Sequence, residues 1–247
     1  MGKVALITGA GRNIGKSIAL ALAQEGFDIV INVRKSLDEG EAVAAMVRGL
    51  GRKAQVCAAN VANPADVKHM FSTIQQSFGH LNALVNNAAI RGESEFSALS
   101  FDEWKRVLDI CLDGAFLCTQ ASLPLLSGQE DASIVNIGGL TAHAGATHRA
   151  HVVTAKAGLV GFTRALAEEL APAGIRVNCV SPGLVDTVRV ADSAPVAPAH
   201  HKKKSNFMGR RGTAEEIADV VSWLCSTRSS YVTGQVVHAN GGAYLGG

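Results

Sequence analysis

The sequence predicts a doubly wound α/β fold, in which helices cover both faces of one parallel sheet within a single domain spanning residues 1–247. Short runs rich in valine, isoleucine and alanine recur along the chain, and each has the length of a buried strand. Segments with helical apolar spacing separate these runs. Such alternation is typical of a parallel sheet, because a right-handed crossover helix must return the chain to the same edge.

The predicted strands, in chain order, comprise residues 3–8, 28–33, 54–59, 82–86, 133–137, 175–180 and 234–238. Helical spacing is clear after the first of them, at Ile14, Ile18 and Leu22. Residues 186–212 break the alternation, and that stretch is too long for an ordinary connection. Because it follows the sixth strand, at the carboxyl edge where open α/β sheets bind ligands, we expect it to form a lid insertion.

Composition and charge exclude several classes of protein. Hydrophobic residues make up 47% of the chain and charged residues 18%, which excludes a disordered protein, and no stretch reaches the roughly 18 apolar residues of a membrane span. The net charge of +2 is too small to indicate nucleic-acid binding. The N-terminus lacks the order of regions found in a signal peptide, so we expect a cytoplasmic protein. Five cysteines without a C-x-x-C pair indicate free thiols in a reducing compartment and no metal site.

The first predicted strand ends in a glycine-rich turn, residues 8–15 (TGAGRNIG), which opens a helix. Backbone N–H groups and the positive end of the helix dipole can meet a pyrophosphate there. Alone, this turn could be only a tight strand-to-helix connection. Two further motifs follow later strands, namely residues 86–89 (NNAA) and residues 181–183 (SPG) with Thr187.

Together these motifs resemble the short-chain dehydrogenase/reductase family, in particular its 3-oxoacyl-acyl-carrier-protein reductase type, and the likeness covers nearly the whole chain. The resemblance implies a Rossmann fold with a nicotinamide dinucleotide lying across the carboxyl edge of the sheet. It places the adenine near Asn60 and Val61 and the carboxamide near Thr187. The other residues that it implies for cofactor binding are Gly9, Asn13, Ile14, Gly15, Asn87, Ala88, Lys156, Pro182 and Gly183.

Three of these motif positions depart from the family pattern. Asn13 replaces a glycine, Asn60 replaces an aspartate and Ala89 replaces the last glycine of N-N-A-G. Asparagine tolerates a left-handed turn better than other non-glycine residues, and an asparagine at position 60 still offers an acceptor. We therefore expect cofactor binding to survive.

The end of the second strand predicts NADP rather than NAD. An acid there would bind the adenosine ribose and repel a 2′-phosphate, but the position holds Val33, followed by Arg34 and Lys35. Arg12, in the glycine-rich turn, faces the same corner, and guanidinium groups suit phosphate. The alternative is that Arg34 and Lys35 are merely a charged end to the strand.

The catalytic positions are where this sequence leaves the family. The family has an Asn, a Ser and a Y-x-x-x-K pair, whereas this chain has Cys111, Gly139 and Val152 at the first three positions and only Lys156 unchanged. In the family the tyrosine gives a proton to the developing alkoxide, which valine cannot do. Lys156 keeps the implied role of holding the nicotinamide ribose, and its plainer interpretation is an exposed helix lysine.

Several nearby side chains are candidates for the missing proton donor. His148 would share a face with Val152 and Lys156 if the helix already extends that far. Thr141 lies close to the missing hydroxyl, as does His143, whereas His151 points about 100° away around the helix. Each histidine has a plainer interpretation as a helix-start or subunit-contact residue. A metal site formed by His148 and His151 lacks an obvious carboxylate partner, so we expect no metal site.

Three functions remain open. The first is an NADP-dependent oxidoreductase acting on a small carbonyl or alcohol with a non-standard proton donor; the second is a non-catalytic dinucleotide-binding protein; the third is a redox-neutral isomerase, hydratase or lyase. The substrate pocket is expected from residues 91–97, residues 141–149 and the lid. The resemblance also implies a homo-oligomer, a tetramer or a dimer, supported by the small residues Ala157, Gly158, Gly161 and Ala165.

Overall fold

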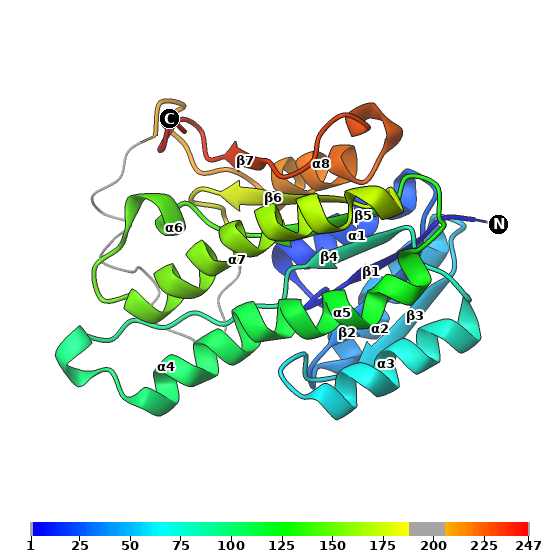
Figure 1. The fold of residues 1–247 in the computed structure, drawn as a ribbon, viewed down its shortest axis with the longest axis horizontal. Helices are drawn as coiled ribbons and strands as arrows, with labels where there is room; N and C mark the ends of the chain where they lie inside the picture. The colour runs from blue at the N-terminus through cyan, green and yellow to red at the C-terminus, as the bar shows by residue number, and fades with distance from the viewer. Residues whose placement is uncertain (1, 188–205, 247) are drawn as a thin grey trace.

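A computed structural model describes residues 2–187 and 206–246, which form a seven-stranded parallel sheet between two layers of helices (Figure 1). The strands are β1 (Val4–Ile7), β2 (Asp28–Val33), β3 (Ala54–Ala58), β4 (Ala83–Asn86), β5 (Ser133–Ile137), β6 (Arg176–Pro182) and β7 (Val236–Ala239). Each lies within two residues of its predicted bounds. The predicted fold class is therefore confirmed.

The strand order places a crevice at one edge of the sheet. The order is β3-β2-β1-β4-β5-β6-β7, so the chain runs outward from β1 in one direction and then restarts at β4 on its other side. Ligands of open α/β sheets bind at such a switch point, beyond the carboxyl ends of the strands. The ends of β1 and β4 are therefore where a site is expected.

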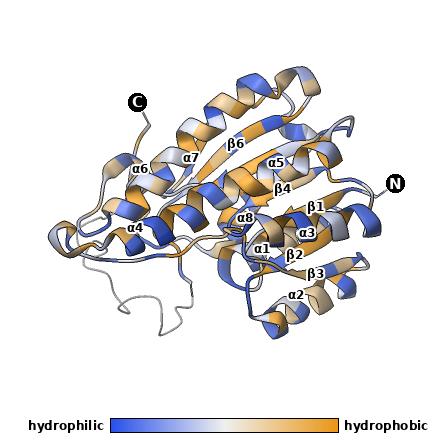
Figure 2. Cartoon of the chain, turned by 60° about the horizontal axis from the view of Figure 1, so that its bottom comes forward, coloured by the Kyte–Doolittle hydropathy of each residue, from blue (hydrophilic) through white to orange (hydrophobic). Residues whose placement is uncertain are grey.

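Helices bury one apolar face each against the sheet. On one side pack α1 (Asn13–Gln24), α2 (Leu37–Gly49) and α8 (Ala214–Leu224); on the other pack α3 (Pro64–Ser77), α5 (Gly114–Leu126) and α7 (Ala150–Glu169). Residues of β1 alternate between the two cores, with Ala5 and Ile7 on the first side and Val4 and Leu6 on the second. Figure 2 shows the result, strands that are mostly apolar and helices with mixed faces.

Two shorter helices and one π-helical turn complete the described elements near the site. They are α4 (Phe101–Leu108), the turn over Asp109–Asp113, which joins α4 to α5, and α6 (Thr141–Ala144). The π turn holds Cys111 in an apolar cluster with Val152 of α7. Such turns inside helices are rare and are frequently found at functional sites.

The predicted lid over residues 186–212 falls mostly outside the described residues. Its two ends are described, and they meet: Val185 pairs with Gly212, and the Asp186 N–H donates to the Gly212 carbonyl at 2.9 Å. An ion pair of 2.5 Å between Arg211 and Asp186 joins them as well. The two described ends of this stretch thus lie side by side next to β6.

The cysteines behave as small apolar residues. All five are buried and none forms a disulfide. Burial raises the pKa of Cys57 and Cys225 to about 11 and that of Cys118 to about 12, so these thiols stay protonated at neutral pH. Within residues 2–187 and 206–246 there is no cluster of three metal-ligating side chains, and no helix there is long and apolar enough to span a membrane.

Candidate active site

The glycine-rich turn after β1 needs unusual backbone angles and very close packing. Gly9 and Asn13 both have positive φ, at 63° and 50°, so the asparagine adopts the left-handed conformation that its side chain tolerates. A Cβ atom on Gly15 would collide with the Gly9 carbonyl and lie 2.6 Å from the Asn87 amide nitrogen. The close approach of helix α1 to the turn therefore requires glycine at position 15.

Hydrogen bonds fasten this turn to the end of β4. The Asn87 side-chain amide donates to the carbonyls of Thr8 and Gly9 at 2.9 and 3.0 Å. In return, the Thr8 hydroxyl accepts from the backbone N–H groups of Asn87 and Ala88 at 3.0 and 2.9 Å. The residues of the first two sequence motifs thus form one rigid unit at the switch point.

Asn32 is a site residue that the sequence analysis missed. Its carbonyl oxygen accepts from the Gly9 N–H at 3.3 Å, and its amide donates to the carbonyls of Cys57 and Ala59 at 3.2 and 3.0 Å. The side chain is buried in β2 and links the ends of three strands. A polar residue inside an otherwise apolar strand was the available signal, since a buried amide must find partners.

These features fit a dinucleotide. Helix α1 begins after Arg12, whose side chain does not cap the helix. The positive end of α1 therefore presents N–H groups that Arg12 leaves uncapped toward the crevice. Across the crevice, a Cβ atom on Gly183 would lie 2.8 Å from the backbone of Asn240, so the two segments pack backbone to backbone. A pyrophosphate is the kind of ligand that such a cradle accepts.

The corner beside β2 contains one acid that the sequence analysis did not foresee. Val33 ends β2 and packs against Gly11, as the predicted position requires, and Arg34 follows it on the surface. The Arg12 guanidinium lies 3.6 Å from the Glu39 carboxylate, and both side chains are about half exposed. Two arginines and one carboxylate therefore share the corner.

The expected adenine end lies beyond β3. Asn60 is partly buried, and its side-chain oxygen accepts from the Ala62 N–H at 3.3 Å. Val61 is buried and packs against Gly114, so that a Cβ atom on Gly114 would lie 2.8 Å from the Val61 side chain. At the other end of the crevice, Thr187 is partly buried and is the last residue described before position 206.

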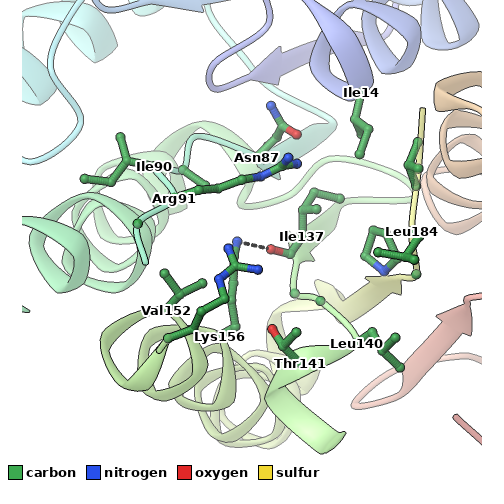
Figure 3. A pocket seen from close by; sticks show the side chains of 18 of the residues that line it. Ile14, Asn87, Ile90, Arg91, Ile137, Leu140, Thr141, Val152, Lys156 and Leu184 are labelled. Atoms are coloured by element: carbon green, nitrogen blue, oxygen red, sulfur yellow. Dashed lines mark hydrogen bonds between the residues drawn. The ribbon is translucent and has the colours of Figure 1, made fainter. Parts of the chain in front are cut away.

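A cavity of about 170 Å³ opens at the carboxyl ends of β4, β5 and β6 (Figure 3). It brings together six of the predicted site residues, namely Ile14, Asn87, Thr141, Lys156, Pro182 and Gly183. From the two stretches expected to form the substrate pocket, only Arg91, Gly92, Glu93, Thr141 and Arg149 line it. Ser94–Ser97 and residues 142–148 do not, so that expectation was too broad.

Lys156 lies at the centre of this cavity wall. Its side chain is buried, with 8% of the residue exposed, and its Nζ donates to the Ile137 carbonyl at 2.6 Å (Figure 3). Burial lowers the pKa of Lys156. The charges of Arg91 and Arg149 lower it as well, whereas Cys111 and Cys179 act to raise it. The interpretation of Lys156 as an exposed helix lysine is therefore wrong.

The three residues that the sequence analysis aligned with the family's Asn, Ser and Tyr lie near Lys156. Val152 lies one helical turn before it, and both Val152 and Gly139 line the cavity. Cys111 packs against Val152, and its thiol donates to the Ile90 carbonyl at 3.6 Å. This wall of the cavity is apolar at the positions where the family pattern has hydroxyl groups.

His148 does not share a helical face with Lys156, and that expectation is corrected. Helix α7 begins at Ala150, whereas His148 has a left-handed φ of 61° and an exposed side chain. Its carbonyl accepts from the Ser94 N–H at 2.8 Å, which ties this turn to another loop. The imidazole therefore does not line the cavity.

The other two candidate histidines, His151 and His143, are likewise absent from the described lining of the cavity. His151 is buried, and its Nε2 lies 3.5 Å from the Glu103 carboxylate on α4. His143 packs its ring 4.6 Å from that of His238 and 5.3 Å from that of Tyr244. Burial lowers the pKa of His143, His151 and His238, which favours their neutral forms at physiological pH.

The sheet order, the glycine-rich turn and the backbone cradle define a dinucleotide-binding Rossmann protein. A family model described as enoyl-(acyl carrier protein) reductase matches residues 9–244. The 3-oxoacyl-[acyl-carrier-protein] reductase FabG of Staphylococcus aureus is 37% identical over 248 residues, covering 99% of each chain. That of Aquifex aeolicus is 38% identical over 244 residues, covering 98% of each.

Solved structures agree with these relatives. A short-chain dehydrogenase from Burkholderia cenocepacia in complex with NADP has a TM-score of 0.90 at 32% identity, over 98% of this chain and 97% of that one. The acetoin dehydrogenase YohF from Salmonella typhimurium has a TM-score of 0.89 at 33% identity, over 98% and 96%. The chain belongs to the short-chain dehydrogenase/reductase family of NAD(P)-dependent oxidoreductases.

Proposed function

We propose that the protein is an NADP-dependent oxidoreductase that interconverts a small carbonyl compound and its alcohol with a proton donor other than tyrosine. The observation that best supports this is a buried lysine in a cavity that adjoins an intact dinucleotide cradle. The names of the relatives, reductases and dehydrogenases, and the NADP bound to one neighbour point the same way.

The proposed cofactor contacts follow the crevice from end to end. The glycine-rich turn and the N-terminus of α1 would hold the pyrophosphate, and Lys156 would hold the nicotinamide ribose. The full proposed set is Gly9, Arg12, Asn13, Ile14, Gly15, Arg34, Asn60, Val61, Asn87, Ala88, Lys156, Pro182, Gly183 and Thr187. The dinucleotide, when bound, would supply or accept the hydride.

Lys156 is the proposed acid, with Thr141 orienting the carbonyl oxygen. During reduction the Lys156 ammonium would give its proton to the alkoxide, directly or through the Thr141 hydroxyl. A lysine whose pKa is lowered is a stronger acid than an ordinary one, and its pKa lies closer to the working pH. His148, which faces solvent, is not needed for this step.

The direct test is to incubate the protein with NADPH and a panel of small ketones while following NADPH consumption. Oxidation of NADPH with formation of the alcohol is expected for at least one compound. Binding of NADPH without oxidation would favour a non-catalytic dinucleotide-binding protein, which the three altered catalytic positions would explain. Conversion of a compound without cofactor would favour a redox-neutral enzyme.

NADPH should bind more tightly than NADH, and Arg34→Ala should lower the affinity for NADPH at least about tenfold because a charge-assisted hydrogen bond to the 2′-phosphate is lost. The affinity for NADH should barely change. Glu39→Gln should raise the affinity for NADPH, since it removes the carboxylate beside Arg12. Titration of each variant with both cofactors measures this, with Arg48→Ala as an exposed control on α2. Equal wild-type affinities would contradict the assignment.

The protein should form a homo-oligomer, a tetramer or a dimer, in which α7 packs against a copy of itself. Ala157, Gly161 and Ala165 are exposed at four-residue intervals along α7, whereas Gly158 faces inward against Leu112. Small residues at this spacing let helix backbones approach closely. Light scattering at micromolar concentration measures the mass, and a monomer there would refute the proposal.

A further inference from the structure

Lys156 combines burial with access to a cavity, which is unusual for a lysine. Of the lysines in the part of the chain that the structure describes, it alone is buried, yet it lines the cavity at the ends of β4, β5 and β6. Its Nζ donates to the Ile137 carbonyl at 2.6 Å. One N–H of a neutral amine satisfies that carbonyl, so the nitrogen lone pair and the second N–H can meet a molecule in the cavity.

The surroundings of Lys156 favour the neutral amine over the ammonium. Burial is the largest cause of its lowered pKa. Among the described residues, the groups that act to raise this pKa are the thiols of Cys111 and Cys179 rather than carboxylates. Burial raises the pKa of Cys179 to about 11, so that thiol is uncharged at neutral pH and cannot pair with an ammonium. A larger fraction of Lys156 is therefore unprotonated at neutral pH than of an ordinary lysine.

The cavity wall beside this amine is apolar. Val152 lies one helical turn before Lys156 on α7, and Figure 3 shows the two side chains on the same wall. Val152 belongs to a buried apolar cluster with Val107 and Ala155, and Ile90 packs against that cluster. Such a wall offers water no hydrogen-bond partner. A lysine that is desolvated in apolar surroundings is activated as a nucleophile toward carbonyl compounds.

We propose that Lys156 is a nucleophile that binds small aldehydes and ketones covalently, as an imine, in this cavity. The nitrogen lone pair forms a bond to the carbonyl carbon, and the carbonyl oxygen leaves with both amine hydrogens as one water molecule. The step needs no oxidant or reductant. It goes beyond the proposed oxidoreductase, in which the same residue gives a proton, because it uses the amine form and requires no nicotinamide.

Borohydride trapping tests this proposal on the protein without added nucleotide. The protein is incubated with acetone, butanone or propanal, sodium borohydride reduces any imine to a stable amine, and peptide mass mapping locates the adduct. Lys156 should carry the adduct at least about tenfold more often than Lys105, since a pKa difference of about one unit changes the amine fraction about tenfold. Lys105 is the matched comparison because it is about half exposed and Asp109, 2.9 Å away, raises its pKa.

Exchange of the ketone oxygen gives a second measurement, because an imine returns to the ketone with an oxygen atom taken from water. In water enriched in the heavy oxygen isotope, the protein should accelerate the uptake of label by acetone. Lys156→Arg keeps a positive charge but has no amine that can attack, so it should remove most of this acceleration. Lys105→Arg is the matched control and should behave as the parent.

Either of two results overturns the proposal: an adduct no more frequent on Lys156 than on Lys105 with all three carbonyl compounds, or an oxygen exchange that Lys156→Arg leaves unchanged. The trapping comparison needs no variant, so it decides the matter even if Lys156→Arg does not fold. Failure of the proposed function looks different, because it shows as absent NADPH binding or absent NADPH oxidation, and neither of these is measured through the trapped adduct.

Discussion

Introducing the missing serine and tyrosine together, as Gly139→Ser with Val152→Tyr, should raise kcat/KM for simple ketones with NADPH by about 10²- to 10⁴-fold. This is the range that a positioned general acid contributes. A Cβ atom at Gly139 meets nothing within 4 Å, so a serine fits there, and Val152 borders the cavity that a phenol ring would enter. Lys156 lies one turn beyond Val152, where it would lower the pKa of the new phenol.

The control for this gain is Gly139→Ala with Val152→Phe, which adds the same bulk without either hydroxyl and should show no gain. Initial rates of NADPH oxidation with a panel of ketones measure both pairs, after cofactor titration has shown that each still binds NADPH. If the serine and tyrosine variant binds NADPH and stays as slow as the parent, the remaining cavity is not a competent reductase frame. Cys111 would then be the next position to restore, as Cys111→Asn.

Lys156→Met should lower the turnover of the true substrate by at least about 10²-fold, since it removes the proposed acid. It should also weaken NADPH binding, because the ribose loses a donor. Methionine has a similar length and fills the same buried space, so the fold should survive. Lys53→Met, at an exposed lysine before β3, is the matched control and should behave as the parent.

The pH dependence distinguishes an acid from a merely structural lysine. Reduction needs the ammonium form, whose fraction falls as pH rises through the pKa of Lys156. Because burial lowers that pKa, the rate of reduction should decline with rising pH well below the range in which an ordinary lysine titrates. The residual activity of Lys156→Met should lack this decline. A parent rate that stays flat up to the ordinary lysine range would refute the role.

The fold and the backbone shape of the glycine-rich turn followed from the sequence because local chemistry specifies them. A run such as residues 29–31 is apolar, and every residue of β2 is buried, which suits a strand covered on both faces, and helices between such runs require parallel pairing. The turn over residues 8–15 is likewise specified locally, since Gly9 and Asn13 tolerate its left-handed backbone angles and Gly15 leaves room for the Gly9 carbonyl. That position 152 is valine and not tyrosine was also evident from the sequence alone.

The residue at which α7 begins, Ala150, could not be predicted from the sequence in this way. Periodicity allowed His148 to belong to the helix, but the turn that fixes its left-handed conformation is tied to Ser94, more than fifty residues earlier. Helix starts are decided by such contacts as much as by propensity. The proton-donor hypothesis for His148 depended on this one boundary and lost its geometric basis with it.

The sequence by itself determined the class of protein and the sheet, because each depends on residues adjacent in the chain. Only the tertiary structure decided what surrounds Lys156. Arg91 follows β4, Arg149 precedes α7 and Arg211 lies between β6 and α8, and all three line one cavity because those segments meet at one edge of the sheet. The charge of a cavity is a sum over segments that the chain keeps far apart, so no local pattern reveals it.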